Sequence, residues 1–334
     1  MISEDILIAR YLAPISGAGS MSLLDDAAVL SPPRGHDLVL TKDALVAGVH
    51  FFADDPPQSI ARKALRVNLS DLAAKGATPA GFLLALALPS DIDESWIKAF
   101  AGGLVDDARA YACPLLGGDT VKASGGLTIS VTAIGYCETG RMVKRTSGRS
   151  GHKLMVTGTI GDAALGLQVR LQPDAAWVRA LSPDARAQLA DRYLHPQPRN
   201  VLATIIRDHA AAAMDVSDGL LGDAMKLAAS ARVHGVSVAP RIDLALVPLS
   251  LAAQQAIAHD PALISTIVTG GDDYEVLMAA SEDQVERVAS ACGTLRVTAT
   301  VIGELVDGQA AVFVGRDGQP VHFGTHKFEH AWSE

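Results

Sequence analysis

Cysteine is scarce in this chain of 334 residues, and its scarcity excludes a disulfide framework. The three cysteines, Cys113, Cys137 and Cys292, lie far apart and form no Cys-x-x-Cys pair. Neither a set of disulfides nor a zinc site is therefore readable from their spacing. Isolated thiols of this kind are typical of a protein from a reducing, intracellular compartment.

Clusters of basic residues and long apolar runs are also missing. The longest apolar run, 81–88, is too short to cross a bilayer. The formal net charge of −9 excludes nonspecific binding to nucleic acid or anionic membranes, because both need clustered Lys and Arg. The opening residues, MISEDILIARYLAP, carry acids where a secretory signal carries bases. We expect a cytoplasmic protein without nucleic-acid or membrane partners.

The composition that is present predicts two compact domains. Hydrophobic residues make up 49% and charged residues 19%, which is enough apolar surface for a sizeable core. The length exceeds the size at which one core usually keeps growing, so two domains are expected. A stretch rich in Arg, Lys, Ser and Gly at 140–151 marks the boundary. We therefore predict domains at 1–140 and 141–334.

Apolar segments alternate with helical patterns, which indicates an α/β fold. In the first half we predict strands at 27–30, 37–41, 82–88 and 127–136. The second strand is predicted to end at Lys42-Asp43. In the second half, strand 153–157 leads through the glycines of 158–162 into a helix, where a helix N-terminal anion site could form.

The helix that contains Asp71 is the clearest single element. Ser59 can cap it, apolar residues recur at spacings of three and four, and Gly76 ends it. Asn68 and Asp71 are three residues apart and project from the same side. The alternative, a satisfied polar pair near a helix end, stays open from this segment alone.

Six aspartates lie beside Gly, Ser or Thr at the ends of apolar segments, where α/β folds gather ligand sites. They are Asp26, Asp43, Asp71, Asp119, Asp215 and Asp218. If they converge, two carboxylates about 4 Å apart repel by roughly 4 kcal/mol at an effective dielectric near 20. A divalent cation would offset this repulsion, and oxygen ligands without His or Cys clusters favour magnesium. Each aspartate could equally be a helix cap or a turn residue.

Seven motifs in register give the chain a family resemblance. They are LDDAA at 24–28, DALVAGVHF at 43–51, NLSDLAAKGATP at 68–79, GGDT at 117–120, VTGTIGD at 156–162, MDVSDGL at 214–220 and GGDDYEV at 270–276. Together they resemble the thiamine-monophosphate kinase family, within the aminoimidazole-ribonucleotide-synthetase-like superfamily. HPQPR at 195–199 and FEH at 328–330 add to the resemblance.

The resemblance implies a homodimeric, magnesium-dependent kinase that transfers the γ-phosphoryl group of ATP to thiamine monophosphate. It implies an N-terminal sheet domain for ATP, metal and dimerisation, whose sheets pair into a barrel across the dimer, and a C-terminal α/β sandwich domain. Direct in-line attack by the substrate phosphate would need no protein base, so we expect no catalytic side chain. The number of ions and a role for potassium stay open.

The resemblance also assigns positions in this sequence. Metal positions are Asp26, Thr41, Lys42, Asp43, Asp71, Asp119, Asp215 and Asp218. Nucleotide positions are Gly118, Asp119, Arg145 and Ser217. Positions lining the thiamine phosphate site are His50, Asp272 and Phe328.

The sequence departs from the family pattern at several of these places. Ser22-Leu23-Leu24 replaces the usual Gly-x-Gly, Thr41-Lys42-Asp43 replaces Ser-Thr-Asp, and Asp272 replaces Glu. Gly151-His152 also stands where the family usually has Gly-Asp. Two alternatives follow: a noncatalytic nucleotide-binding paralogue, or a superfamily relative that acts on another substrate.

Overall fold

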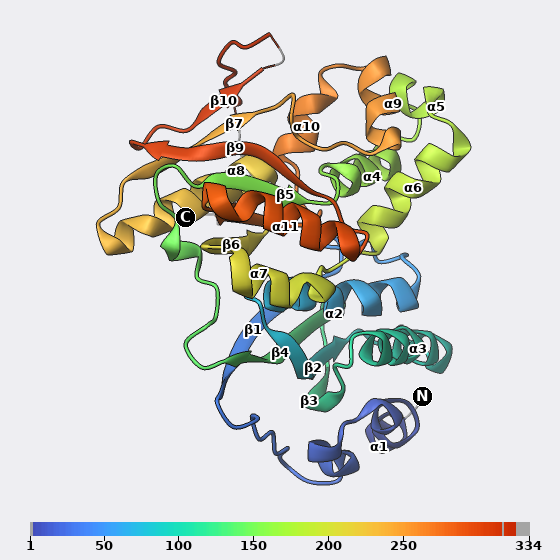
Figure 1. Ribbon diagram of the computed structural model, residues 1–334. Coiled ribbons are helices and arrows are strands. Elements are labelled where there is room, and N and C mark those ends of the chain that lie inside the picture. Colours follow the sequence, from blue (N-terminus) through green and yellow to red (C-terminus); the bar gives the residue numbers. More distant parts are fainter. Residues whose placement is uncertain (1–2, 316, 325–334) are drawn as a thin grey trace. The chain divides into compact units, whose positions relative to one another are not determined.

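The computed structural model describes residues 3–315 and 317–324 (Figure 1). The chain divides into two compact units. The first contains the residues up to Leu72 and Ala77–Met142, and the second contains Ala73–Gly76 and the residues from Val143 on. Within the described ranges, no helix has the length and apolar character that a membrane span requires.

The first unit is built on a four-stranded sheet with the order β1-β4-β2-β3. Neighbouring strands run antiparallel except β2 and β3, which are parallel. The strands are β1 (His36–Val46), β2 (Thr78–Leu88), β3 (Leu115–Lys122) and β4 (Thr128–Glu138).

Helices α2 (Pro57–Ala74) and α3 (Glu94–Ala110) pack on one face of this sheet (Figure 1). Strand alternation buries Ile129, Val131 and Ala133 of β4 on that covered face. The opposite face, which we call the open face, leaves Leu40 63% exposed. The chain begins with short helical turns: α1 (Glu4–Leu7), η1 (Ile8–Leu12), η2 (Ala13–Ile15) and η3 (Ala18–Leu23).

The second unit has a six-stranded sheet with the order β10-β7-β9-β5-β8-β6. Only β10 and β7 pair in parallel. The strands are β5 (Lys153–Thr157), β6 (Ala212–Asp215), β7 (Val238–Asp243), β8 (Val276–Ala280), β9 (Ala299–Asp307) and β10 (Val312–Val314).

Helices cover both faces of the second sheet, which explains its continuously apolar central strands. Leu154 and Val156 of β5 join one core, and Met155 between them joins the other. Helices α4, α6, α8, α9 and α10 contribute to the first core, and α7 and α11 to the second. The helices are α4 (Asp162–Leu171), α5 (Ala176–Ala180), α6 (Pro183–Leu194), α7 (Ala203–His209), α8 (Leu220–Ser230), α9 (Leu251–His259), α10 (Leu263–Thr269) and α11 (Glu282–Thr294), with single turns η4 (Arg145–Ser147), η5 (Asn200–Leu202) and η6 (Ala231–His234).

Three sequence predictions about these elements were wrong. Residues 27–30 form no strand, and β1 does not end at Lys42-Asp43 but continues to Val46, because its pairing with β4 continues. Ser59 lies inside α2 rather than at its cap, since the helix already begins at Pro57. Proline at a first helical turn loses no hydrogen bond there, so it allows the earlier start.

Candidate functional site

The first unit brings three predicted ligand side chains to the covered face of its sheet. Thr41 Oγ1 on β1 donates a hydrogen bond to Asp71 Oδ2 on α2. One helical turn earlier, Asn68 Oδ1 accepts a hydrogen bond of 3.0 Å from the backbone N–H of Asp43. Asn68 is fully buried, so its amide fixes β1 against α2. Thr41, Asp43 and Asp71 therefore form one oxygen-rich group.

Lys42 and Asp119 lie apart from this group. Strand alternation turns Lys42 to the open face, since its neighbours on β1 face the helices. Asp119 on β3 pairs with Ala85 on β2. Asp43 on β1 pairs with Val131 on β4, which pairs with Leu84 on β2. Because neighbouring residues of a strand face opposite sides of the sheet, Asp43 and Asp119 lie on opposite faces. The structure therefore does not place Lys42 or Asp119 beside Asp71.

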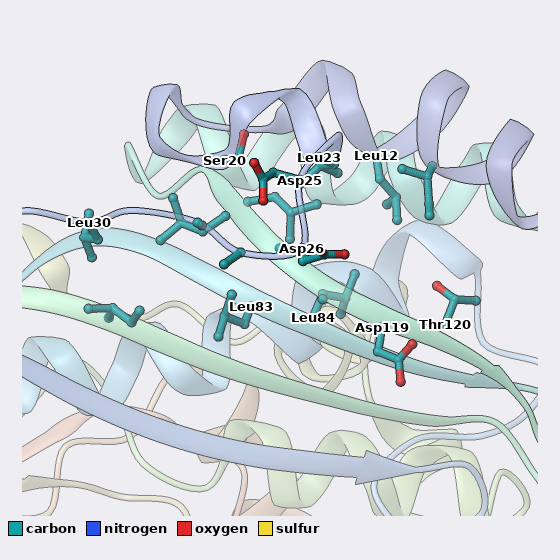
Figure 2. A pocket seen from close by; sticks show the side chains of 18 residues that line it. Leu12, Ser20, Leu23, Asp25, Asp26, Leu30, Leu83, Leu84, Asp119 and Thr120 are labelled. Atoms are coloured by element: carbon teal, nitrogen blue, oxygen red, sulfur yellow. The ribbon is translucent and has the colours of Figure 1, made fainter.

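Asp26 and Asp119 instead line a pocket of about 660 Å³ in the first unit. Residues 20–30 form one wall, and β2 and β3 form the other (Figure 2). Figure 2 shows Asp25 and Asp26 on the loop and Asp119 on β3, with the three carboxylates pointing in different directions. Both Asp26 and Asp119 are exposed to solvent.

The pocket wall at β3 requires glycine at one position. A Cβ atom on Gly118 would lie 1.9 Å from the carbonyl oxygen of Leu84 on β2. No larger residue fits without moving the backbone, so the GGDT motif is needed for close strand pairing next to the pocket.

Just before Asp25 and Asp26, three non-glycine residues have positive φ angles, which are usual only for glycine. Met21, Ser22 and Leu23 have φ angles of 48°, 58° and 59°. This left-handed region costs non-glycine residues conformational energy, and it coincides with the place where the family usually has Gly-x-Gly. Of the segment Ser22-Leu23-Leu24, Ser22 and Leu23 have this conformation, whereas Leu24 has a φ of −100°.

His50, predicted to line the thiamine phosphate site, is held by the backbone around it. Its Nδ1 accepts a hydrogen bond of 3.0 Å from Val46 N–H, so the ring proton of the neutral form lies on Nε2. The ammonium of the buried Lys63 donates to the His50 carbonyl oxygen at 3.0 Å. His50 is therefore an oriented side chain of the first unit and not a freely solvated one.

In the second unit, Asp215, Ser217 and Asp218 lie where β6 ends and α8 begins. A carboxylate missed by sequence reasoning, Asp223, accepts 3.0 Å hydrogen bonds from the N–H groups of Ser217 and Asp218. Asp223 is fully buried, and burial raises its pKa. Asp218 does not cap α8, whose N-cap residue is Gly219, and Asp223 instead holds the turn that precedes the helix. An acid in the first turn of a helix was the available signal.

The segment 270–275 lies directly against this turn. The N–H of Asp272 donates to the Ser217 carbonyl at 2.9 Å, and the N–H of Tyr274 donates to the Val216 carbonyl at 2.8 Å. Asp272 and Tyr274 have positive φ angles of 73° and 52°. The predicted nucleotide position Ser217 and the predicted substrate position Asp272 are therefore neighbours.

Glu275 fixes the end of that segment through a buried ionic network. Its carboxylate accepts from Thr157 Oγ1 at 2.7 Å, Arg192 Nη2 at 3.0 Å and Arg199 Nε at 2.6 Å. Glu275 is fully buried, and Arg192 is 7% exposed. The HPQPR motif thus supplies Arg199 as a structural partner. Sequence reasoning did not single out Glu275 or Arg192.

The predicted anion site at the start of α4 is filled by the protein itself. The N–H of Gly161 donates to both Asp273 oxygens, at 3.0 and 2.8 Å. Asp273 is 1% exposed, and this burial raises its pKa well above its usual range. Asp162 beside it, held by Ser250 and Thr159, also has a pKa raised by burial.

Two further predicted positions remain. Arg145 is half-buried on the turn η4 of the second unit. Phe328 lies outside the described residues. Within 3–315 and 317–324, no three His, Cys, Asp or Glu side chains gather closely enough to hold a metal ion.

Comparison with known proteins covers nearly the whole chain. Residues 24–137 match the family described as AIR synthase related protein, N-terminal domain, and residues 149–315 match its C-terminal domain. A thiamine-monophosphate kinase of Caulobacter vibrioides is 42% identical over 95% of this chain and 88% of its own. A protein of the same name from Escherichia coli K12 is 38% identical over 98% of both.

Solved structures show the same similarity. Thiamine-monophosphate kinase from Stenotrophomonas maltophilia K279a has a TM-score of 0.79 and 38% identity, covering 90% of this chain and 91% of that chain. AaThiL, solved in complex with AMPPCP and TMP, has a TM-score of 0.75 and 28% identity, covering 98% of both chains. Hydrogenase maturation protein HypE, at 16% identity and a TM-score of 0.78 over 99% of this chain and 96% of its own, shares the fold.

The buried Asp273 carboxylate predicts a distinct pH dependence of stability. Its raised pKa means that the folded state holds the proton more tightly. This contribution to stability is complete below the unfolded pKa, about 3.9, and is lost as pH rises through the folded pKa. Asp273→Asn should therefore gain melting temperature relative to the wild type as pH rises from about 5 to about 8.

The control is Asp283→Asn on α11, because hydrogen bonds from Ser281 and Gln284 lower the pKa of Asp283. The difference in melting temperature between this variant and the wild type should stay constant over the same pH range, because Asp283 is already ionised there. Differential scanning fluorimetry across pH measures both. A flat difference for Asp273→Asn would contradict the prediction.

Proposed function

The chain belongs to the thiamine-monophosphate kinase family of AIR synthase related proteins, and from this premise we propose that it phosphorylates thiamine monophosphate with ATP. The product is thiamine diphosphate. The observation that carries the proposal is similarity over 98% of both chains to a protein solved with AMPPCP and TMP. The kinases from Caulobacter and Escherichia match over 95% and 98% of this chain.

Magnesium is the ion that the candidate residues fit. Every proposed ligand offers carboxylate or hydroxyl oxygen, the donor type that magnesium prefers. When bound, magnesium neutralises phosphate charge and aligns the phosphates. Lys42 is left out, since an ammonium has no lone pair to donate, and we assign potassium no site. The proposed ligands are Asp26, Thr41, Asp43, Asp71, Asp119, Asp215 and Asp218.

The remaining site positions divide between the two substrates. We assign Gly118, Asp119, Arg145 and Ser217 to the nucleotide, and His50, Asp272 and Phe328 to thiamine phosphate. The hydrogen bond between Asp272 N–H and the Ser217 carbonyl supports neighbouring roles for these two. Gly118 lines the same pocket as Asp119, which supports assigning both to one ligand.

Phosphoryl transfer in this account is a direct displacement. The phosphate of thiamine monophosphate is ionised at neutral pH and attacks the γ-phosphorus in line, while ADP leaves with the electron pair of the broken bond. No proton has to be removed, so no side chain acts as a base. The chain contributes orientation: Thr41 and Asn68 fix the carboxylate and backbone that face the substrates, and positioning dominates the rate enhancement.

The open face of the first sheet supports a homodimer whose sheets pair into a barrel. Leu38, Leu40 and Leu83 lie on this face and are 39%, 63% and 39% exposed. Exposed apolar side chains that share one face are what a surface covered by another chain requires. We assign the functional domains to 1–140 and 141–334. All three cysteines are free thiols, which fits the proposed cytoplasmic location.

Leu40→Glu tests the dimer. A carboxylate at the centre of a buried apolar interface is left unpaired, so dimer affinity should fall by at least about 100-fold. Leu251→Glu is the control, because Leu251 in the second unit is 76% exposed. Sedimentation velocity across protein concentration measures both. An unchanged dimer in Leu40→Glu would show that this face is not the interface.

Asp71→Asn tests the metal ligands. The amide keeps the shape of the side chain but removes its charge, so thiamine diphosphate formation should fall by at least about 100-fold with little change in melting temperature. Asp106→Asn is the control, since Asp106 lies on the surface of the same unit, where it pairs with Arg62. Chromatography of product made from ATP, magnesium and thiamine monophosphate gives the rate. Normal turnover in Asp71→Asn would remove Asp71 from the site.

The same assay of the wild-type chain tests the proposed activity. Product formation supports the kinase. ATP binding without product would favour a noncatalytic nucleotide-binding paralogue. The non-glycine residues at positive φ in the loop before Asp25 are the observation that favours this second candidate.

A further inference from the structure

Lys226 on α8 connects a proposed metal ligand with a buried carboxylate. Its ammonium forms an ion pair with Asp218 Oδ2 and a second one of 3.1 Å with Asp223 Oδ1. The side chains of Lys226 and Asp218 are 30% and 37% exposed, whereas that of Asp223 is completely buried. The lysine thus bridges one accessible and one inaccessible carboxylate.

The two ends of this bridge differ in how firmly they are held. Asp223 Oδ2 already accepts two backbone N–H groups, so Asp223 cannot turn away from Lys226 without breaking both. The Asp218 carboxylate, by contrast, is 37% exposed and is held by Lys226. Lys226 is therefore anchored at Asp223, and Asp218 is the partner that can be exchanged.

A lysine ammonium on a carboxylate occupies the oxygen that a metal ion would need. It also places a positive charge next to the incoming cation, and two like charges a few ångströms apart repel. Because Lys226 is only partly exposed, solvent screens this repulsion incompletely.

We propose that Lys226 is a built-in counter-cation of Asp218, which a divalent metal ion must displace before it can bind there. The inference rests on the proposed function for the assignment of Asp218 as a ligand. Lys226 then acts as a positioning residue that lowers the metal affinity of the second unit when no nucleotide is bound.

The test is the binding of Mn²⁺ alone to the full chain. The electron paramagnetic resonance signal of the unbound ion measures this binding. Lys226→Met should bind Mn²⁺ about 10-fold more tightly than the wild type, or bind one additional ion. Lys226→Arg keeps the charge and should bind as the wild type does. Lys226→Met combined with Asp218→Asn should lose the gain.

Lys153→Met is the matched control in the same unit. Lys153 also bridges two carboxylates, Glu304 at 2.9 Å and Glu282 at 3.4 Å, neither of which is a proposed ligand. Its removal should leave Mn²⁺ binding unchanged. If Lys153→Met gained as much as Lys226→Met, general loss of positive charge would explain the effect and the proposal would fail.

Removing Lys226 leaves Asp223 buried without its cation, and this could unfold the second unit. Lys226→Met combined with Asp223→Asn avoids that cost, because the asparagine oxygen still accepts both N–H groups. The double variant should show the same gain. The inference would be overturned if either variant folds and still binds Mn²⁺ with wild-type affinity.

Thiamine diphosphate formation by the wild type is measured separately, so the two hypotheses can fail independently. A wild type that forms product, together with a Lys226→Met variant without a gain in Mn²⁺ affinity, would leave the kinase and reject the counter-cation. A wild type that forms no product, together with a Lys226→Met variant that gains Mn²⁺ affinity, would reject the kinase and leave the counter-cation.

Discussion

Buried carboxylates in the second unit must be satisfied by partners from distant segments, and this requirement fixes the loops that carry the candidate ligands. Glu275 is held by Arg192, Arg199 and Thr157, and Asp223 by two N–H groups and Lys226. Removing one partner of such a buried pair costs roughly 3–5 kcal/mol, because the remaining charge stays unpaired. The loops therefore keep their conformation before any substrate binds.

The chain separates the acids that support the structure from those available for chemistry. Asp223, Asp273 and Glu275 are almost completely buried, whereas Asp26, Asp71 and Asp218 keep contact with solvent. Asp215 is the exception, because this proposed ligand is only 6% exposed. The turn after β6 contains both kinds, since the side chain of Asp218 is 37% exposed and that of Asp223 is completely buried.

The sequence predicted the family and the mixed α/β class, because these depend on motifs and local apolar patterns. It could not predict which acid of a motif points inward. In GGDDYEV the resemblance selected Asp272, but the network depends on Glu275, whose partners lie far away in sequence. Likewise, the face of β1 that carries Asp43 rather than Lys42 follows from pairing with β4. The described residues also do not show the expected convergence of Asp26, Asp71 and Asp119.

The central claim, which we propose, is that carboxylates of this chain hold the metal-bound triphosphate of ATP. A crystal of the chain soaked with Mn²⁺, a non-hydrolysable ATP analogue and thiamine monophosphate tests it directly through anomalous scattering. The account predicts manganese in contact with the carboxylates of Asp43 and Asp71, next to the analogue phosphates. A bound nucleotide whose phosphates carry no manganese at these carboxylates would contradict it.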